Sequence, residues 1–387
     1  MKSSKKNRLF DSYLLKGKLR RSGYEKIRYI FSGVNRLSGE KKSFFVEFYY
    51  VNPLVSPDTP VLAQKFQPAV SPQDVQYALS GLSTVKGSFS ETDVLPSYVL
   101  DKAGVFGING KQVNSFIPAN SVHYDKSDNS IYAGECKFGF DSLKGSVRVT
   151  GEDLDNRPEL YCSTGNIEWN LNFEKITDVC VFNDADGQIW IPGGAKTIFS
   201  GSVTVDGETY TVIPKSSSGY IDKSWGVRPL NPYYHLSSSN LISAITGKKL
   251  LKSCFAIEGE FDSRLCIYVC IEGNAIILKG KSLFCKYSEI HDWVEMPQDA
   301  DGKKLHWTVS VQYKKYVIDF DLYCRIDEMF VRDYEMPYGK NEMQKILGGG
   351  TGFGEVRIYK KVKKNLELID HINTLDVLCE YGSTDKN

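Results

Sequence analysis

The sequence predicts a mostly β protein built from antiparallel sheets, and three observations lead to this prediction. Apolar runs rich in Val, Ile, Tyr and Phe recur along the chain and often alternate with polar residues, as strands do. Asp-Gly, Glu-Gly-Asn and Ser-Gly turns separate these runs and suit antiparallel hairpins. Convincing amphipathic helices are few. We therefore expect barrels or sandwiches of sheets with few, short helices.

The predicted elements follow one another mainly as strands, with one good helix candidate. That candidate is SPQDVQYALSGL over 71–82, because Ser71 is suited to cap its start and Pro72 to occupy its first turn. The strand runs, in chain order, are KSFFVEFYYV, KGSVRV, IEWNLNF, IFSGSVTVDGETYTVI, CIYVCIEGNAIILKG, LHWTVSVQY, YVIDFDLYC and GEVRIYKKV.

A chain of 387 residues is long for one core, so two domains are expected. An internal repeat supports this, since YIFSGVNRLSGEKKSFFVEF resembles YHLSSSNLISAITGKKLLKSCFAI. The matched pairs are Tyr29 and Tyr234, Asn35 and Asn240, and Leu37 and Ile242. The repeat predicts a duplicated β domain, with a basic segment over 1–22 and domains over 23–227 and 228–387.

Charge and cysteine content exclude some classes of function. Lys+Arg 48 and Asp+Glu 47 nearly cancel, which disfavours a nucleic-acid partner that needs a basic field. No apolar run is long enough to cross a membrane. Nine cysteines, an odd count in a chain without a secretory signal, predict buried reduced thiols in a cytoplasmic protein.

The basic N-terminus has two interpretations. Leu9, Phe10, Tyr13 and Leu14 are apolar positions among Lys and Arg, a pattern typical of a short helix in weak contact with a membrane surface. The alternative is a partly frayed terminus that docks on the body of the protein.

Motifs for nucleotides, metals and serine nucleophiles are missing from the sequence. In LGGGTGFGEVRIYKK over 347–361, Gly350, Gly352 and Gly354 alternate and a strand pattern follows, so backbone crowding or a bend is expected rather than a dinucleotide loop. No G-x-S-x-G elbow occurs. The histidines lie far apart, and no second pair completes a zinc set with Cys266 and Cys270. We expect no metal site and no cofactor.

The densest mix of aromatic and hydrogen-bonding residues is GYIDKSWGVRPLNPYYHLSSSN over 219–240. In a strand, one face carries Tyr220, Asp222 and Ser224, and the other carries Ile221, Lys223 and Trp225. Either Asp222 faces a cavity with Tyr220, or Asp222 pairs with Lys223 or Arg228 at the surface while Trp225 plugs a barrel end.

The stretch GYIDKSWG over 219–226 resembles the Tyr-x-acid-x-x-Trp-Gly signature of tocopherol cyclases and carotenoid 1,2-hydratases (hydroxyneurosporene synthase). FFVEFYYVNP and GGGTGFGEVRIYKK add to the resemblance, which spans roughly residues 23–380 and is closest to bacterial members of the group. It implies two lipocalin-like β domains with an apolar cavity, and acid chemistry on an alkene without metal or nucleotide. This chain departs from the group at Tyr233, Tyr234 and His235, where a Trp pair is common.

Three functional hypotheses follow. In the first, a cofactor-free cyclase, hydratase or isomerase acts on a prenyl, polyene or similar molecule, with Asp222 as general acid at a raised pKa. In the second, the same cavity carries or senses such a ligand without turnover. In the third, the protein is structural or regulatory and the Trp-Gly motif joins two barrels. The residues expected to catalyse are Asp222, Tyr220 and His235, and those expected to bind ligand are Tyr233, Tyr234, Asn231, Ser237, Asn240 and Trp225.

Overall fold

The structure is a computed structural model of the whole chain. It describes residues 12–55, 95–158, 160–177, 183–185, 187–278, 287–339 and 342–384, without describing the side chains of 183–185 and 287. The helix expected over 71–82 lies outside the described residues, as do Leu9, Phe10, Cys180 and Cys285.

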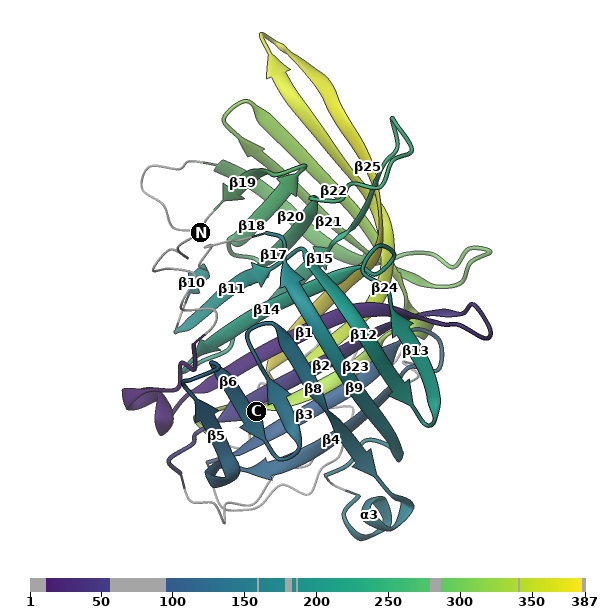
Figure 1. The fold of residues 1–387 in the computed structure, drawn as a ribbon. Helices are drawn as coiled ribbons and strands as arrows, with labels where there is room; N and C mark the ends of the chain where they lie inside the picture. The colour runs from purple at the N-terminus through teal and green to yellow at the C-terminus, as the bar shows by residue number, and fades with distance from the viewer. Residues whose placement is uncertain are drawn as a thin grey trace.

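Antiparallel strands dominate the described chain and form two sheets (Figure 1). The first sheet contains β1 (Tyr24–Asn35), β2 (Lys41–Val51), β3 (Tyr98–Phe106), β4 (Lys111–Pro118), β5 (Val122–Asp125), β6 (Ser130–Ala133), β7 (Cys136–Phe138), β8 (Ser142–Val149), β9 (Gly165–Lys175), β10 (Asn183–Ala185), β11 (Gln188–Gly194), β12 (Thr197–Val205), β13 (Glu208–Val212) and β14 (Gly219–Gly226). Strand β1 pairs with β2, β13 and β14 and is the centre of this sheet.

The second sheet is formed by the chain after β14. Its strands are β15 (Tyr233–Ser238), β16 (Asn240–Ser243), β17 (Cys254–Glu260), β18 (Leu265–Ile271), β19 (Asn274–Leu278), β20 (Tyr287–Glu295), β21 (Lys304–Tyr313), β22 (Tyr316–Arg325), β23 (Phe330–Glu335), β24 (Met343–Val362) and β25 (Asn365–Thr384). The helical pieces are η1 (Gly17–Arg20), η2 (Ala119–Ser121), α3 (Gly151–Asn156) and η3 (Ile326–Glu328). The predicted fold class, mostly β with antiparallel sheets and few short helices, is confirmed.

Each sheet curls around its own apolar core (Figure 1). In β1 the odd-numbered residues Ile27, Tyr29 and Phe31 belong to the core inside the first sheet, which we call the first barrel. The even-numbered residues of β1 point the other way, and Ile30 joins a further core that also contains Phe330 of the second sheet. The two sheets therefore pack face to face, and the alternation of β1 supplies side chains to both sides.

The glycine run in β24 serves this packing. A Cβ on Gly350 would lie 2.4 Å from the ring of Phe106 in the first sheet, and one on Gly348 would lie 2.7 Å from Cγ of Glu380. The register between β24 and β25 shifts between Gly349 and Gly354, where the strand bends. The expectation of backbone crowding and a bend at these glycines is confirmed.

The two halves of the internal repeat form hairpins with the same hydrogen bonds. Asn35 N–H donates to Glu40 at 2.9 Å in one hairpin, and Ser243 N–H donates to Lys248 at 3.0 Å in the other. The turn of the first hairpin therefore aligns Asn35 with Ser243 rather than with Asn240. The interruption at Ser239, between β15 and β16, accounts for one residue of this shift.

Two simpler expectations concern thiols and membrane helices. The described cysteines are free, and all except the half-buried Cys162 are buried. Among the described helices, none combines the length and the apolar character that crossing a bilayer requires.

We predict that Gly350→Ala lowers the free energy of unfolding by about 1–3 kcal/mol, because the new methyl group overlaps the Phe106 ring. Urea unfolding measures this loss. The matched control is Gly151→Ala, whose methyl group meets no atom within 4 Å, and which should change stability by less than about 0.5 kcal/mol. Equal effects of the two substitutions would contradict the packing role of Gly350.

Candidate functional site

Strand β14 carries the motif GYIDKSWG, and all eight of its residues are buried. Ile221 and Lys223 face the first barrel, where Ile221 joins the core. Tyr220 lies on the other face, in the core shared by the two sheets. The predicted division of β14 into two faces is therefore present, but the space in front of Tyr220 and Asp222 is filled by the second sheet. We call this region the intersheet layer.

Arg28 is the centre of the intersheet layer. Its guanidinium donates to both carboxylate oxygens of Asp222, at 3.2 Å from Nε and 2.6 Å from Nη2. Its Nη1 donates to Glu380 of the second sheet at 2.5 Å. Arg28 is 1% exposed and Glu380 is fully buried. A single arginine thus joins carboxylates of both sheets away from water.

The register of the first sheet places alternating charges in one row. Asp222 of β14 lies opposite Arg28 of β1, Arg28 lies opposite Glu47 of β2, and Glu47 lies opposite Lys102 of β3. Lys102 Nζ lies 3.5 Å from Glu47 Oε1, and both residues are buried. Opposite charges on neighbouring strands attract one another, so the row stabilises this register.

The second sheet repeats this arrangement around His235. His235 of β15 lies opposite Glu258 of β17 and Glu380 of β25, as Arg28 lies between Glu47 and Asp222. Arg28 Nη2 is 3.2 Å from His235 Nε2, and an arginine nitrogen only donates, so Nε2 accepts. The hydrogen-bond network therefore places the ring proton on Nδ1, which donates to Glu258 at 3.1 Å.

The predicted pKa of Asp222 is wrong. Burial does raise the pKa of this carboxyl, but the positive charge of Arg28 outweighs burial and holds the pKa below its ordinary value. Tyr220 OH and Trp190 Nε1 also donate to Asp222, at 2.9 and 3.2 Å. Asp222 is thus an ionised hydrogen-bond acceptor in this arrangement and has no proton to give. Neither Lys223 nor Arg228 is its partner, since Lys223 pairs with Glu25 at 2.5 Å and Arg228 is exposed.

Three potential metal ligands, Asp222, His235 and Glu258, meet in the intersheet layer with their ligand atoms within 4.8 Å of one another. Sequence reasoning grouped Asp222 with His235 but missed Glu258, which lies on β17 and meets His235 only through strand pairing. The guanidinium of Arg28 already contacts Asp222 and His235 and supplies a positive charge between them. A metal ion would have to displace Arg28, so these residues fit a structural ion network better than a metal site.

The structure brings together only some of the predicted site residues. Tyr233 OH donates to Glu258 and Glu380, each at 3.2 Å, and Ser237 Oγ lies 3.0 Å from His235 Nε2. The other predicted residues lie elsewhere. Tyr234 donates to the carbonyls of Asp292 and Thr308, Asn231 donates to Thr384, and Asn240 donates to Asp376. Trp225 occupies the face of β14 opposite Asp222.

Sequence reasoning missed most of the charged residues of the layer. Arg28, Glu47, Glu258 and Glu380 each interrupt an apolar strand run, as in YEKIRYIF and FFVEFYY. A charge whose neighbours two residues away are apolar is a usable signal, as at Glu47, because strand alternation places it on a buried face. The signal fails at Arg28 and Glu258, which each have a charged residue two positions away. The sequence does not indicate which of these charges meet.

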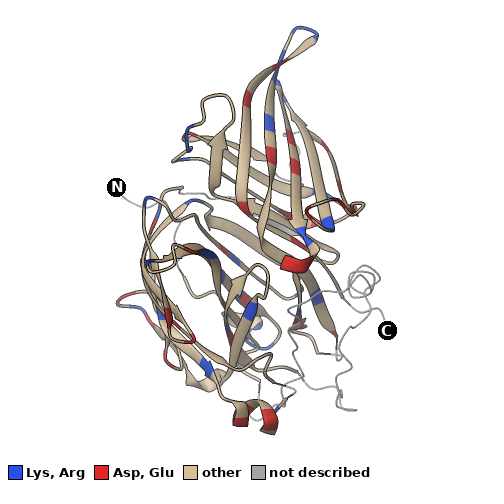
Figure 2. Cartoon of the chain, turned by 90° about the vertical axis from the view of Figure 1, so that its right-hand side faces the viewer, with Lys and Arg blue, Asp and Glu red and all other residues tan. Residues whose placement is uncertain are grey.

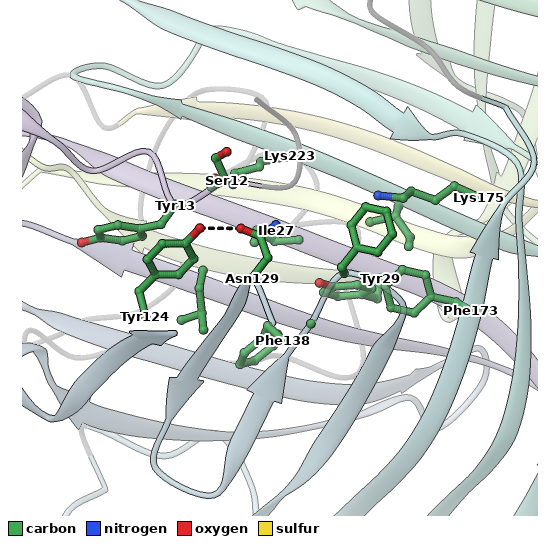
Figure 3. A pocket seen from close by; sticks show the side chains of 14 residues that line it. Ser12, Tyr13, Ile27, Tyr29, Tyr124, Asn129, Phe138, Phe173, Lys175 and Lys223 are labelled. Carbon is green, nitrogen blue, oxygen red and sulfur yellow. Dashed lines mark hydrogen bonds between the residues drawn. The ribbon is translucent and has the colours of Figure 1, made fainter. Parts of the chain in front are cut away.

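The first barrel contains a small cavity of about 30 Å³. Figure 3 shows Tyr13 and Tyr124 at one end, and Tyr29, Phe173 and Lys175 at the other. The other lining residues are Ser12, Ile27, Asn129, Ile131, Phe138, Gly139, Phe140, Ile221 and Lys223. A volume of this size holds about one water molecule. The walls are thus aromatic and aliphatic, with a few polar groups at the edges.

Asp101 is an isolated acid inside the first barrel. It lies on the face of β3 that carries Val99 and Ala103 of the barrel core, and it is fully buried. Its carboxylate oxygens make no hydrogen bond of ordinary geometry with the described residues, and the one polar side chain that interacts with them is the weakly donating thiol of Cys136. Burial raises the pKa of Asp101 to about 8, and the neighbouring Cys136 thiol offsets this only in part. A buried carboxyl with this pKa stays largely protonated at neutral pH.

The register places Asp101 close to the cavity wall. Asp101 lies opposite Phe48 of β2, and Phe48 lies opposite Ile27 of β1, which lines the cavity. The Phe48 ring packs 4.8 Å from that of the wall residue Phe138. Phe48, which lies behind the wall, therefore separates Asp101 from the cavity.

Comparisons with known proteins give structural neighbours only. No protein-family model and no curated protein matches the sequence. Similar solved structures include CghA with Sch210972, at 9% identity over 95% of this chain and 90% of that chain with a TM-score of 0.44. A candidate AttH from Nitrosomonas europaea has 10% identity over 92% and 91%, and kievitone hydratase from Nectria haematococca has 10% over 95% and 91%, each with a TM-score of 0.41. Similarity at this level assigns no ligand and no reaction.

We predict that Arg28→Met lowers the free energy of unfolding by about 3–5 kcal/mol, because it leaves the carboxylates of Asp222 and Glu380 buried without their cation. The double variant Arg28→Met/Asp222→Leu should recover part of this loss, since it removes one of the two unpaired charges. Urea or thermal unfolding measures both.

A surface ion pair provides the control for this experiment. Lys137 pairs with Asp128 at 2.8 Å, with side chains 30% and 37% exposed. Lys137→Met should cost at most about 1 kcal/mol because water screens the pair. If Arg28→Met cost no more than Lys137→Met, the intersheet network would not be holding the fold together.

Proposed function

We propose that the protein binds a small lipophilic molecule, such as a prenyl or polyene compound, inside the first barrel, and that Asp101 donates a hydrogen bond or a proton to it. The observation that carries this proposal is Asp101 itself. A fully buried carboxyl group whose one polar contact is a weakly donating thiol destabilises the folded state, so its presence calls for a compensating role. A ligand with a carbonyl, a hydroxyl or an alkene would supply the missing acceptor.

The cavity walls support an apolar ligand. Tyr29, Phe138 and Phe173 offer ring faces, and aliphatic side chains fill the spaces between them. Rings of this kind attract a developing carbocation, so the same walls suit an acid-catalysed cyclisation, hydration or isomerisation. Lys223 and Glu25 form a buried ion pair at 2.5 Å, so the part of the cavity next to Lys223 is polar.

Entry of a ligand requires space that the cavity of about 30 Å³ does not offer. The segment over 12–15 is the part of the wall best able to provide it, because it belongs to no strand. It is held by a 2.5 Å bond from Lys223 to the Ser12 carbonyl and by a 2.8 Å bond from Leu14 N–H to Glu25. The ring of Tyr13 lies 5.7 Å from that of Tyr124. We propose that the ligand displaces Tyr13 and that the Phe48 ring turns aside, because this ring lies between Asp101 and the cavity.

The proton donor is then Asp101 rather than Asp222, and Asp222, His235 and Tyr220 have a structural role. These residues would tie a domain over 23–227 to one over 228–387. Asp222 is ionised and paired with Arg28, whereas Asp101 keeps its proton at neutral pH. Carriage without turnover is the second candidate function, because the cavity is equally suited to hold a ligand that does not react.

We predict that Asp101→Asn changes the pH dependence of stability. The folded pKa of about 8 exceeds the unfolded value of about 3.9, so the folded state holds a proton that the unfolded state has lost between these values. Wild-type stability should therefore fall relative to Asp101→Asn by about 1.4 kcal/mol per pH unit between pH 5 and 7. Urea unfolding at each pH measures the difference, and a difference that did not vary with pH would exclude a protonated Asp101.

We predict that the protein binds all-trans-retinol and that Tyr13→Gly strengthens this binding by about tenfold, since the lost ring enlarges the cavity. Phe173→Trp should weaken it by filling the opposite end. Retinol fluorescence enhancement measures the affinity. Tyr316→Ala, a change in the second sheet, is the control and should leave affinity unchanged. Absence of saturable binding by both wild type and Tyr13→Gly would overturn the proposed ligand class.

A further inference from the structure

A second, larger hollow lies on the outer face of the second sheet. It has a volume of about 570 Å³, which is within the range of small-molecule sites. It is lined by Ile242 of β16, Asp321 and Tyr323 of β22, Phe353, Gly354, Glu355 and Arg357 of β24, and Asn373, Thr374 and Leu375 of β25. We call it the outer groove. Its wall is formed by the second sheet, away from Asp101 and Arg28.

The outer groove forms where β24 bends. The register between β24 and β25 shifts between Gly352 and Gly354. Gly354 has φ +153°, and a Cβ there would lie 2.0 Å from the Asp321 carbonyl oxygen, so no other residue fits. The bend and the missing side chain hollow a face that would otherwise be an even strand surface, and bulges of this kind often accompany binding sites.

The groove walls combine aromatic rings with polar groups. The rings of Tyr323 and Phe353 lie 5.9 Å apart at an interplanar angle of 25°. His306 stacks on Tyr323 at 4.3 Å and holds that ring in place. Leu375 adds a further apolar side chain, 45% exposed. The polar side consists of carboxylates, a guanidinium and the amide of Asn373.

The charges of the groove are already balanced among themselves. Arg357 Nη1 lies 3.5 Å from Asp321 Oδ2, and Arg357 also pairs with Glu355. His306 contacts Asp321 at 2.5 Å, and His371 contacts Glu355 at 3.0 Å. Figure 2 shows acidic and basic residues following one another along neighbouring strands of this sheet. The site therefore offers many hydrogen-bonding atoms but little net charge, which favours a neutral polar ligand over an ion.

We propose that the outer groove binds a neutral oligosaccharide. A pyranose ring has an apolar face of C–H groups and a rim of hydroxyls. The Phe353 ring, supported by Tyr323 and His306, matches the apolar face, because C–H groups pack against ring surfaces. The carboxylates and the guanidinium match the rim of hydroxyls, because the carboxylates accept hydrogen bonds and the guanidinium donates them to neighbouring hydroxyls.

Isothermal titration of the full chain with maltopentaose, cellopentaose and xylopentaose tests this site. We expect saturable binding of at least one of them, weakened about tenfold or more by Phe353→Ala and by Asp321→Asn. Tyr359→Ala, on β24 outside the groove, should leave the affinity unchanged.

Three results would overturn the proposal: no saturable binding of any of the three sugars, equal weakening by Tyr359→Ala and Phe353→Ala, or binding only of a sulfated oligosaccharide such as a heparin fragment. Retinol binding measured on the same variants separates this site from the first barrel. Phe353→Ala should leave retinol affinity unchanged, so either site can fail alone.

Discussion

Arg28 is the constraint on which the rest of the structure depends. It is a cation held away from water between two sheets, and it is matched by Asp222 in its own sheet and Glu380 in the other. Burying these charges is costly, and the cost is offset only while both sheets keep their relative position, since hydrogen bonds of this kind require close distances and aligned donors. The apolar packing of Ile30, Phe45 and Phe106 against Phe330 provides attraction, but it tolerates sliding better than an ion network does.

The two sheets place their buried charges in a similar pattern. Arg28 and His235 occupy matching central strands, β1 and β15, and each lies between two carboxylates on the neighbouring strands. Where the sheets pack face to face, the side chains of Arg28 and His235 meet, and His235 Nε2 accepts a hydrogen bond from Arg28. A second arginine in place of His235 would set two cations against each other. Arg28 and His235 are therefore complementary at the position where the two sheets touch.

The strand alternation also separates two chemical environments that lie one residue apart. On β3, Lys102 faces the intersheet layer and Asp101 faces the first barrel. Burial lowers the pKa of Lys102 to about 8 and raises that of Asp101 to about 8, so each residue is less readily ionised than in water. Lys102 has Glu47 as a charged partner, whereas Asp101 has no charged partner among the described residues. The unpaired group, rather than the paired network, is the better candidate for chemistry.

The sequence by itself determined the strand content, the two faces of β14 and the role of the glycines in β24, because alternation and turn residues are local properties of the chain. It also marked GYIDKSWG as a buried, polar strand. It did not determine that Asp222 would meet Arg28 and Glu380, which lie far away in the chain, and so it assigned Asp222 the wrong pKa. Nor did it distinguish Asp101 from other strand carboxylates. Whether a buried acid keeps its proton depends on which side chains of other strands reach it, and only the tertiary structure decides that.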